Sequence, residues 1–422
     1  MIAIKRLDIK IIADTTKVIL KYLNFGKAER IQPVWEYIAS LDQLEVESQL
    51  KKVFEEFEHR HYNLREAISK YYNRLGEPFN NSDFSEEKKL LLGSYFTQEY
   101  SVEASVFFNP SIVPFEHPQS ADPDTQGFLL SLRATGEGHI SSIAFLTGTV
   151  GFNGRIDLHE RPRKISTPNI TYSIANTEEY TAEFSDDIPV NSRILYPATV
   201  GESNGMEDAR FVLFNEPDER RYIATYTAYN GKDIQIKIIE TNDFKTFKIN
   251  EISGKAASDK GFALFPEKIN GKYVMIGRQG GRNMSIMYSD SLYHWEEFVT
   301  LQVPQRSWEM LQLGNCGSPV KTPQGWLLLT HAVGPMRKYV ISLTLLDLND
   351  PTVVIASLNE PLLSPNEDER EGYVPNVLYT CGMMVHNEDL IIPYAMSDSA
   401  VGFATVKLSD IMAEMFMEKL SI

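Results

Sequence analysis

The sequence predicts an all-β protein, a five-bladed β-propeller with an α-helical extension at its N-terminus. Two observations lead to this fold class. From about residue 100 onwards, apolar runs bounded by turn residues recur, and five pairs of them read as hairpins. A similar turn at residues 243–247 recurs at residues 290–295, 47 residues later, and periods of roughly 40–50 residues with several strands each are typical of propeller blades. We therefore expect residues 1–98 to form a mainly helical extension and residues 99–422 to form the propeller.

The extension begins with residues 1–12, which alternate like a short strand. Further along, apolar residues follow helical spacing in one stripe over residues 44–57, which starts at Leu44, and in a second over residues 64–75. Gly76 and Pro78 end the second stripe, and residues 86–95 form a third helical candidate. These faces either cover the β part or pack against a second subunit, so a homo-oligomer is compatible with the sequence.

The five hairpins are separated internally by short turns. They pair residues 127–136 with 138–150, 222–230 with 232–242, 272–280 with 282–290, 325–334 with 337–347, and 389–397 with 400–408. A further apolar run precedes each pair, which gives each unit three or more antiparallel strands. A β-sandwich with long loops is the alternative, and it fits the repeated period less well.

The composition excludes several classes of partner. A formal net charge of −16 argues against a nucleic-acid surface and against binding to anionic membranes. The two cysteines, Cys316 and Cys381, form no disulfide framework and indicate a reducing compartment. The N-terminus has no unbroken apolar segment typical of a signal peptide, and no apolar run is long enough for a membrane span. We expect a cytoplasmic protein.

Residues 199–212 concentrate charge next to a core strand. Glu207, Asp208 and Arg210 lie within four positions, and the apolar run of residues 211–214 follows directly. We expect these charges in a loop that enters the core. Charges there cost desolvation free energy unless they pair or act in a site. A structural ion pair between a Glu and an Arg at the start of a strand is the alternative interpretation.

Polar side chains also recur at the same position along the first strand of successive hairpins. Counting five residues from the leading apolar residue of each first strand gives Arg133, Thr227, Arg278 and His331. In a propeller this position repeats around the axis, so we expect these side chains to converge on one pocket with Asp208. Two Arg and a His near one carboxylate suit an oxyanion, because Arg binds phosphate through two parallel hydrogen bonds.

Other chemistries lack their motifs. The sequence contains no P-loop, no G-x-G-x-x-G after a strand, no H-E-x-x-H, no G-x-S-x-G and no metal-ligand spacing of His. A carboxylate and a bound anion are then the groups left to carry out the chemistry, which indicates glycosyl transfer. Ordinary glycosidases need two carboxyl groups. If phosphate is the nucleophile, one carboxylic acid suffices.

The segment Gly205–Arg210 resembles the Gly-x-Glu-Asp-Pro-Arg signature of glycoside hydrolase family 130, the β-mannoside phosphorylases and related mannosidases. Ala209 stands where that family usually has Pro. Supporting motifs are spread over about residues 100–410, and they lie at residues 108–111, 132–134, 263–267, 325–331, 372–376 and 395–398. The resemblance implies a five-bladed propeller, in agreement with the hairpin count.

The resemblance also implies roles for individual residues. Asp208 matches the general acid, which acts through a sugar hydroxyl. The implied substrate-binding set is Arg133, His139, Asn204, Glu207, Arg210 and Asp398, of which Arg133 and Asp398 hold the mannose. The implied phosphate-binding set is Asn109, Arg278, His331, Lys338 and Tyr339. The candidates for a second phosphate-binding arginine are Arg282, Arg306 and Arg337.

Three functions follow from this resemblance. The first is an inverting phosphorylase that cleaves terminal β-mannosides with inorganic phosphate and releases α-mannose 1-phosphate. The second is a mannosidase that hydrolyses β-1,2-linked mannosides with water, with Glu267 or Glu207 as the base. The third is a sugar-binding propeller without catalysis. The expected partners are a β-mannose-containing oligosaccharide and inorganic phosphate as co-substrate, with no metal and no organic cofactor.

Overall fold

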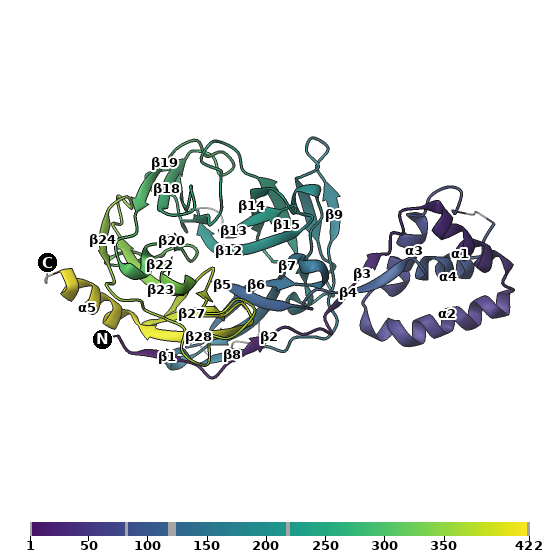
Figure 1. Ribbon diagram of the computed structural model, residues 1–422, viewed down its shortest axis with the longest axis horizontal. Coiled ribbons are helices and arrows are strands. Elements are labelled where there is room, and N and C mark those ends of the chain that lie inside the picture. Colours follow the sequence, from purple (N-terminus) through teal and green to yellow (C-terminus); the bar gives the residue numbers. More distant parts are fainter. Residues whose placement is uncertain (1, 81–82, 117–123, 217–219, 420–422) are drawn as a thin grey trace.

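The structure is a computed structural model, and it describes residues 2–80, 83–116, 124–216 and 220–419. Antiparallel strands outnumber helices along the chain, and four of its longer helices are gathered in one N-terminal segment. Figure 1 shows the strands in groups that surround a common centre, with the helical segment standing to one side. Among the described residues, no helix combines the length and apolar character that a membrane span requires.

The three predicted helical stretches are confirmed as α2 (Gln43–Phe57), α3 (Leu64–Asn73) and α4 (Glu86–Ser94), and a further helix, α1 (Ala28–Ser40), precedes them. Helix α2 starts at a capping box, in which Asp42 accepts from the Glu45 amide and Glu45 accepts from the Asp42 amide. Buried side chains such as Ile38, Leu50 and Ile68 give the helices a core of their own. Leu44, expected in the apolar stripe, lies in the first turn of α2 and is exposed.

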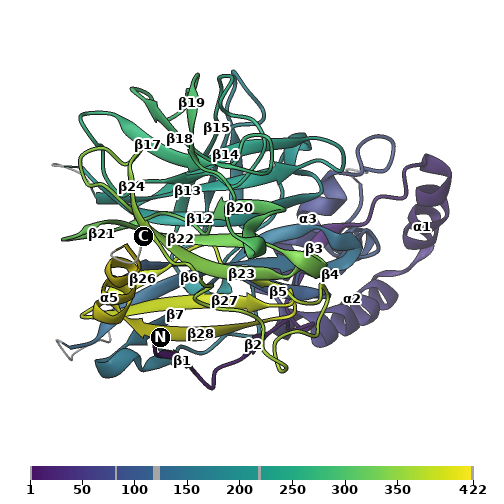
Figure 2. The same ribbon diagram turned by 60° about the vertical axis from the view of Figure 1, so that its left-hand side comes forward.

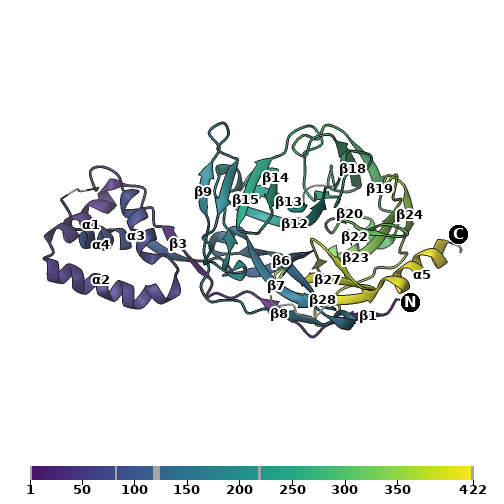
Figure 3. The ribbon, with the colours of Figure 1, turned by 180° about the vertical axis from the view of Figure 1, so that it is seen from behind.

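A two-stranded ribbon joins the helices to the β part. Strand β3 (Val18–Tyr22) pairs antiparallel with β4 (Thr97–Ser101), so the chain enters and leaves the helical segment side by side. Figures 1 and 3 show the helices beside the β part rather than over its centre. The helices therefore do not cover the β part. That they contact a second subunit stays a prediction.

The first two strand groups share an 11-stranded sheet. The first group is β5 (Val106–Pro114), β6 (Gln126–Thr135) and β7 (Ser141–Val150), with β8 (Ile156–Leu158) and β11 (Ile194–Leu195) beside β7. The second runs in the order β12 (Gly205–Asn215), β13 (Arg220–Tyr229), β14 (Ile234–Thr241), β15 (Thr246–Glu251), β10 (Tyr180–Glu183) and β9 (Asn169–Tyr172). One parallel pair, Gly205 with Ser141, links β12 to β7.

The other three groups are separate sheets. The third is β16 (Ala263–Leu264), β17 (Tyr273–Gly277), β18 (Met284–Ser289) and β19 (Phe298–Gln302). The fourth is β20 (Gln312–Asn315), β21 (Val320–Thr322), β22 (Gly325–Val333), β23 (Tyr339–Leu346) and β24 (Val354–Ser357). The fifth is β25 (Leu378–Tyr379), β26 (Met384–His386), β27 (Asp389–Met396) and β28 (Ala400–Lys407), joined by β1 (Ile4–Arg6) and β2 (Ile11–Ile12).

All five predicted hairpins are present, as β6–β7, β13–β14, β17–β18, β22–β23 and β27–β28. The strands near the N-terminus pair with β28, so the beginning of the chain completes its last sheet. Helix α5 (Leu408–Lys419) follows β28 and packs against β24 and β28 (Figure 2). The boundary between residues 98 and 99 stays a prediction. Residues 4–12 belong structurally to the fifth sheet, although they come before that boundary in the chain.

The register of the second group defines one end of that sheet. Gly205 pairs with Tyr229, and Tyr229 pairs with Ile234. Further out, Tyr180 pairs with Ile249 on one side and with Tyr172 on the other. The start of β12 and the end of β9 therefore point in the same direction, and the pairing through Ile249, Ile239 and Ala224 places Tyr172 level with Phe211 of β12.

Candidate active site

Asp208 occupies a bulge in β12. The pairing of β12 with β13 shifts register between Glu207 and Arg210, and Asp208 has a φ of 53°. A bulge re-aims a side chain out of the regular alternation, and bulges are frequent beside active sites. The strand already begins at Gly205, so the charges lie inside a strand and not in the loop that the sequence suggested.

Two side chains from the first strand group hold the Asp208 carboxylate. The amide of Asn109 donates to Oδ1 at 2.8 Å, and Nη1 of Arg133 donates to the same atom at 3.2 Å. Arg133 also donates from Nη2 to Glu207 Oε1 at 2.7 Å and from Nε to Ser141 Oγ at 2.8 Å. The Glu–Arg ion pair that the sequence left open therefore exists, but its arginine is Arg133 and not the neighbouring Arg210.

The pKa values of Asp208 and Asp398 in this cluster shift in opposite directions. Burial acts to raise the pKa of Asp208, but the charge of Arg133 and the hydrogen bond from Asn109 outweigh it and hold that pKa below its usual value. Burial, together with the negative charge of Asp208, raises the pKa of Asp398 to about 6, against the opposing effect of Arg133. In the free site at neutral pH, Asp208 is consequently ionised.

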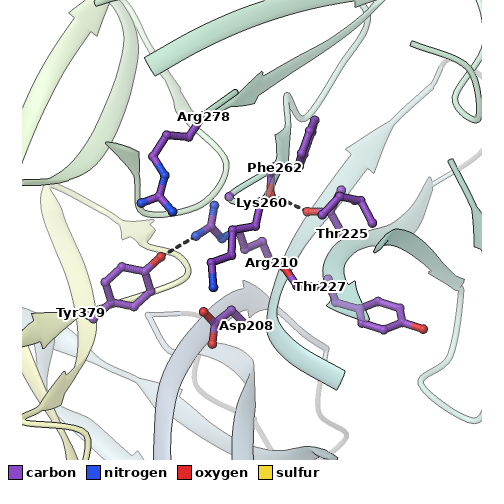
Figure 4. Close-up of a pocket in the computed structure, with 11 residues that line it drawn as sticks. Asp208, Arg210, Thr225, Thr227, Lys260, Phe262, Arg278 and Tyr379 are labelled. Carbon is purple, nitrogen blue, oxygen red and sulfur yellow. Dashed lines mark hydrogen bonds between the residues drawn. The ribbon is translucent and has the colours of Figure 1, made fainter. Parts of the chain in front are cut away.

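Asp208 lies at one side of a small cavity that also contains three cationic side chains. They are Arg210, Lys260 and Arg278 (Figure 4). The end of the Lys260 side chain points toward Asp208 in Figure 4. The other residues that line the cavity are Thr225, Tyr226, Thr227, Ile236, Gly261, Phe262 and Tyr379. Asp208 is the only carboxylate among the lining residues that the structure describes.

The cations lack carboxylate partners. Buried Arg210 donates to Asn315 Oδ1 at 2.8 Å and to the Tyr379 hydroxyl at 2.6 Å, and both acceptors are uncharged. Nε of Arg278 is buried without a hydrogen-bond partner. Within the described ranges, no ion pair within 4.0 Å involves Arg210, Lys260 or Arg278. Buried cations without counter-charges are costly, and a bound anion would offset that cost.

His331 is neutral, contrary to its expected place among the positive charges. Its Nδ1 lies 3.0 Å from the carbonyl oxygen of Asn315, which can only accept, so Nδ1 carries the proton. Nε2 therefore accepts from the Gln312 amide at 3.0 Å and from Arg278 Nη1 at 3.3 Å. Burial, with the charges of Arg278 and Arg210, holds the pKa of His331 well below its usual value. His331 thus positions Arg278 without adding charge.

The close approach of His331 to Arg278 requires a glycine. A Cβ atom at Gly314 would lie 2.5 Å from Cε1 of His331 and 3.3 Å from Cδ of Arg278. Tyr339 lies parallel to the imidazole of His331, with ring centroids 6.1 Å apart and planes at 6°. Tyr339 therefore supports His331 and is not among the residues that line the cavity.

Several expected phosphate ligands lie elsewhere. Lys338 is exposed in the turn before β23 and does not line the cavity, and Asn109 holds Asp208 instead. Of the candidates for the second arginine, Arg306 is bonded to Glu309 and Asn359, while Arg282 and Arg337 are exposed. Arg210, which was expected to bind substrate, is the second arginine that lines the cavity beside Arg278.

The remaining expected substrate ligands lie around Asp208 and farther out. Asp398 has a φ of 52° and is close enough for its charge to interact with Asp208 and Arg133. His139 is exposed, and its Nδ1 lies 3.3 Å from the hydroxyl of Tyr373. Asn204 directly precedes β12, and its side chain lies beside Gly231, which is in the turn between β13 and β14. Asn204 does not line the cavity.

Glu267 is far from the site and cannot serve as the alternative base there. It is paired with Lys321 and lines a separate cavity. The carbonyl oxygen of its neighbour Pro266 accepts from the amide of Asn215, the last residue of β12. The rise of a strand places Asn215 about 20 Å from Asp208. The hydrolytic alternative loses this candidate, because Glu267 lies at the other end of the strand.

Comparison with known proteins identifies the chain. Residues 156–417 match the family described as β-1,4-mannooligosaccharide phosphorylase, a range that contains Asp208, Arg278, His331 and Asp398. The chain belongs to glycoside hydrolase family 130. The expectation drawn from the signature at residues 205–210 is thereby confirmed.

Individual relatives agree with family 130. The chain is 34% identical over 225 residues to a 1,2-β-oligomannan phosphorylase of Thermoanaerobacter sp. (strain X514), covering 52% of this chain and 73% of the relative. It is 35% identical over 219 residues to a β-1,2-mannobiose phosphorylase of the same strain, covering 50% and 71%. A solved β-1,2-mannobiose phosphorylase from Listeria innocua shares the fold, with a TM-score of 0.54 and 23% identity over 75% of this chain and 93% of that chain.

Sequence reasoning missed Lys260 and Tyr379, both of which line the cavity. Lys260 lies in the loop between β15 and β16, between Asp259 and Gly261, which both have positive φ. The count along hairpins could not find it, because loops lie outside that count. The one available signal was the Asp-Lys-Gly sequence directly before the apolar run at Phe262.

We expect Asp398→Asn to stabilise this family 130 protein in a pH-dependent manner. The raised pKa of Asp398, about 6, means that the folded state keeps a proton that the unfolded state has already lost above about pH 4. The wild type therefore loses up to roughly 3 kcal/mol as pH rises from 4 to 6. The variant avoids this loss, so its advantage should be small at pH 4 and larger at pH 8 in denaturant unfolding. The same difference at both pH values would contradict the assignment.

Proposed function

We propose that the chain is an inverting glycoside phosphorylase that cleaves terminal β-mannosides with inorganic phosphate and releases α-mannose 1-phosphate. The observation that carries the proposal is the cavity in which Arg210, Lys260 and Arg278 accompany a single carboxylate, Asp208. Hydrolysis with inversion needs a second carboxylate to activate water. The described lining has none, and Glu207, the other candidate base, is held in an ion pair with Arg133, whereas three cations suit phosphate. The activities named for the relatives support the same reading.

Phosphate binding is also expected to change the pKa of Asp208. The dianion placed among the cations offsets their charge and adds negative charge near Asp208, so the pKa of Asp208 rises. As phosphate binds, Asp208 takes up a proton from solvent, and the protonated carboxyl group then gives it to the leaving glycosidic oxygen, either directly or through a sugar hydroxyl. A phosphate oxygen forms the new bond to C1 on the opposite face while the bond from C1 to the leaving oxygen breaks. The phosphate ester returns its proton to Asp208, which balances the reaction.

The mannose unit is proposed to lie over Asp208. Arg133, Glu207 and Asp398 are the charged groups around that carboxylate, and they can orient sugar hydroxyls. Oδ1 of Asn109 is buried without a partner and can accept from one of them. His139 and Asn204 are assigned to the outer part of the substrate path. The carboxyl group and phosphate supply all the chemistry, so the proposal includes no metal and no organic cofactor.

The fold proposal is the five-bladed β-propeller, with one strand group as each blade and the site near the centre. The helical extension of residues 1–98 and the propeller of residues 99–422 are kept as the proposed division. Both cysteines are free and buried, so the cytoplasm stays the compartment predicted from the sequence. A homo-oligomer is retained as a prediction.

The test uses β-1,2- and β-1,4-linked mannobiose, each with and without inorganic phosphate. We expect α-mannose 1-phosphate, measured by phosphorus NMR, and almost no turnover when phosphate is omitted. Equal release of free mannose under both conditions would identify a hydrolase. Binding of mannosides without turnover of any substrate would identify a sugar-binding protein.

A further inference from the structure

A groove separates the helical extension from the second strand group. One cavity of about 490 Å³ and an adjoining one of about 140 Å³ share Leu20, Lys70 and Tyr71. Strand β3 and helix α3 form one wall, and β9 with residues 196–198 forms the other. Figures 1 and 3 both show β9 on the side of the β part that faces the helices. The volume is in the range of ordinary ligand sites.

Four tyrosines line the larger cavity: Tyr22, Tyr71, Tyr172 and Tyr196. Three of their hydroxyls are fixed by the protein. Tyr71 donates to the Leu20 carbonyl oxygen at 2.8 Å, Tyr172 donates to that of Ala198 at 2.8 Å, and Tyr196 accepts from Lys21 Nζ at 2.6 Å. The rings are therefore oriented before a ligand arrives, which lowers the entropy cost of binding.

The exposure of Tyr172 and the placement of the cations indicate an uncharged ligand. The Tyr172 residue is 47% exposed, although its hydroxyl is bonded, so its apolar ring remains open to solvent. Arg74 lies 4.8 Å from the Tyr22 ring centroid, and Lys21 lies over the Tyr196 ring at 4.8 Å. These two of the three described cations that line the larger cavity are packed on aromatic faces, and the third is Lys70. Open tyrosine rings suit the C–H faces of sugars, whose hydroxyls reach neighbouring polar groups.

The end of β9 that lines the groove points in the same direction as the start of β12, which carries the candidate active site. Tyr172, the last residue of β9, is level with Phe211, three positions from Asp208 along β12, and β9 is five strands out from β12. Five strand spacings amount to about 24 Å. Residues 198–204 connect the two places along the chain. The fully buried Glu202 in that segment accepts from the hydroxyl of Tyr226, which lines the Asp208 cavity.

We propose that this groove is a distal binding site for an uncharged β-linked mannooligosaccharide. It would hold sugar units of a long substrate while the terminal mannose occupies the site at Asp208. The inference rests on the proposed function, because it takes the same oligosaccharide as ligand. Its consequence is chain-length dependence: long substrates use both sites, and a disaccharide uses one.

The test compares a disaccharide with an oligosaccharide of about eight mannose units at saturating phosphate. We expect Tyr172→Ala to raise KM for the long substrate about 5- to 10-fold, as for loss of one aromatic contact. KM for the disaccharide and both kcat values should stay unchanged. The control is Tyr37→Ala, because Tyr37 is a similarly exposed tyrosine, 44% accessible, in the helical extension outside the groove. Equal KM changes for both substrates, or none, would overturn the proposal.

A binding measurement separates this proposal from the proposed function. In an Asp208→Asn background, calorimetry with the long oligosaccharide should show weaker binding when Thr167→Trp fills the groove from an exposed position. If the disaccharide is phosphorolysed but chain length has no effect, the groove proposal alone fails. If no mannoside turns over yet Thr167→Trp still weakens binding, the proposed function fails and the groove stands. Displacement of the oligosaccharide by inorganic sulfate at the groove would identify an anion site and overturn the inference.

Discussion

Replacing Asp208 by asparagine is expected to lower kcat for phosphorolysis of β-mannobiose by about 10²–10⁴-fold, the usual contribution of a general acid. Asparagine keeps the size of the side chain and can still accept from Asn109, but it cannot give a proton to the leaving oxygen. The loss should be much smaller with an aryl β-mannoside whose phenol leaves without protonation. Comparing kcat for the two substrates measures the acid role directly.

The matched control is Glu267→Gln, since Glu267 is a carboxylate at the other end of β12. That variant should keep both kcat and its phosphate dependence. An equal loss with the aryl substrate and the disaccharide in Asp208→Asn would indicate a role in binding or folding instead of proton transfer. A large loss in Glu267→Gln would reopen the hydrolytic mechanism.

The parts of this site that could be predicted come from strand register. Arg133 contacts Asp208, and Thr227 and Arg278 line its cavity, because the first strands of successive hairpins present the same position toward a common centre. The crowding of charge at residues 207–210 was also a sound signal. An uncompensated carboxylate next to a core strand is costly unless neighbouring groups offset it.

The parts that could not be predicted depend on packing between strands. Nothing in the sequence states that Asn315 offers a carbonyl oxygen to Nδ1 of His331, yet this contact fixes the tautomer and makes Nε2 an acceptor. The position of Glu267 follows from the hydrogen bond that its neighbour Pro266 accepts from the amide of Asn215, which is a contact between two strand groups. Lys260 comes from a loop, where no period applies.

The helical extension illustrates the same division. Its helices follow from a 3.6-residue pattern, and that pattern says which faces are buried. It does not say that the helices bury those faces mainly among themselves, or that α3 faces β9 across a groove. Those relations arise from the β3–β4 ribbon, whose pairing joins residues about 80 positions apart in the chain.

The second large effect is expected at the phosphate site. Arg278→Gln should raise KM for phosphate by about 10²–10³-fold, because it removes a buried cation that donates charge-assisted hydrogen bonds. In the synthetic direction, KM for α-mannose 1-phosphate should rise by a similar factor, since both ligands place the same phosphoryl group there. KM for the mannoside should change little. Initial rates in both directions at varied phosphate provide the measurement.

Arg282→Gln is the matched control, because Arg282 is an exposed arginine only four positions further along the chain that does not line the cavity. It should leave KM for phosphate within about twofold, as expected for an exposed charge. If the two variants behave alike, net positive charge and not the cavity attracts phosphate. If Arg278→Gln raises KM for the mannoside as much as KM for phosphate, Arg278 belongs to the sugar subsite. The three cations would then need another anion, and Asp208 would need another source for the charge that raises its pKa.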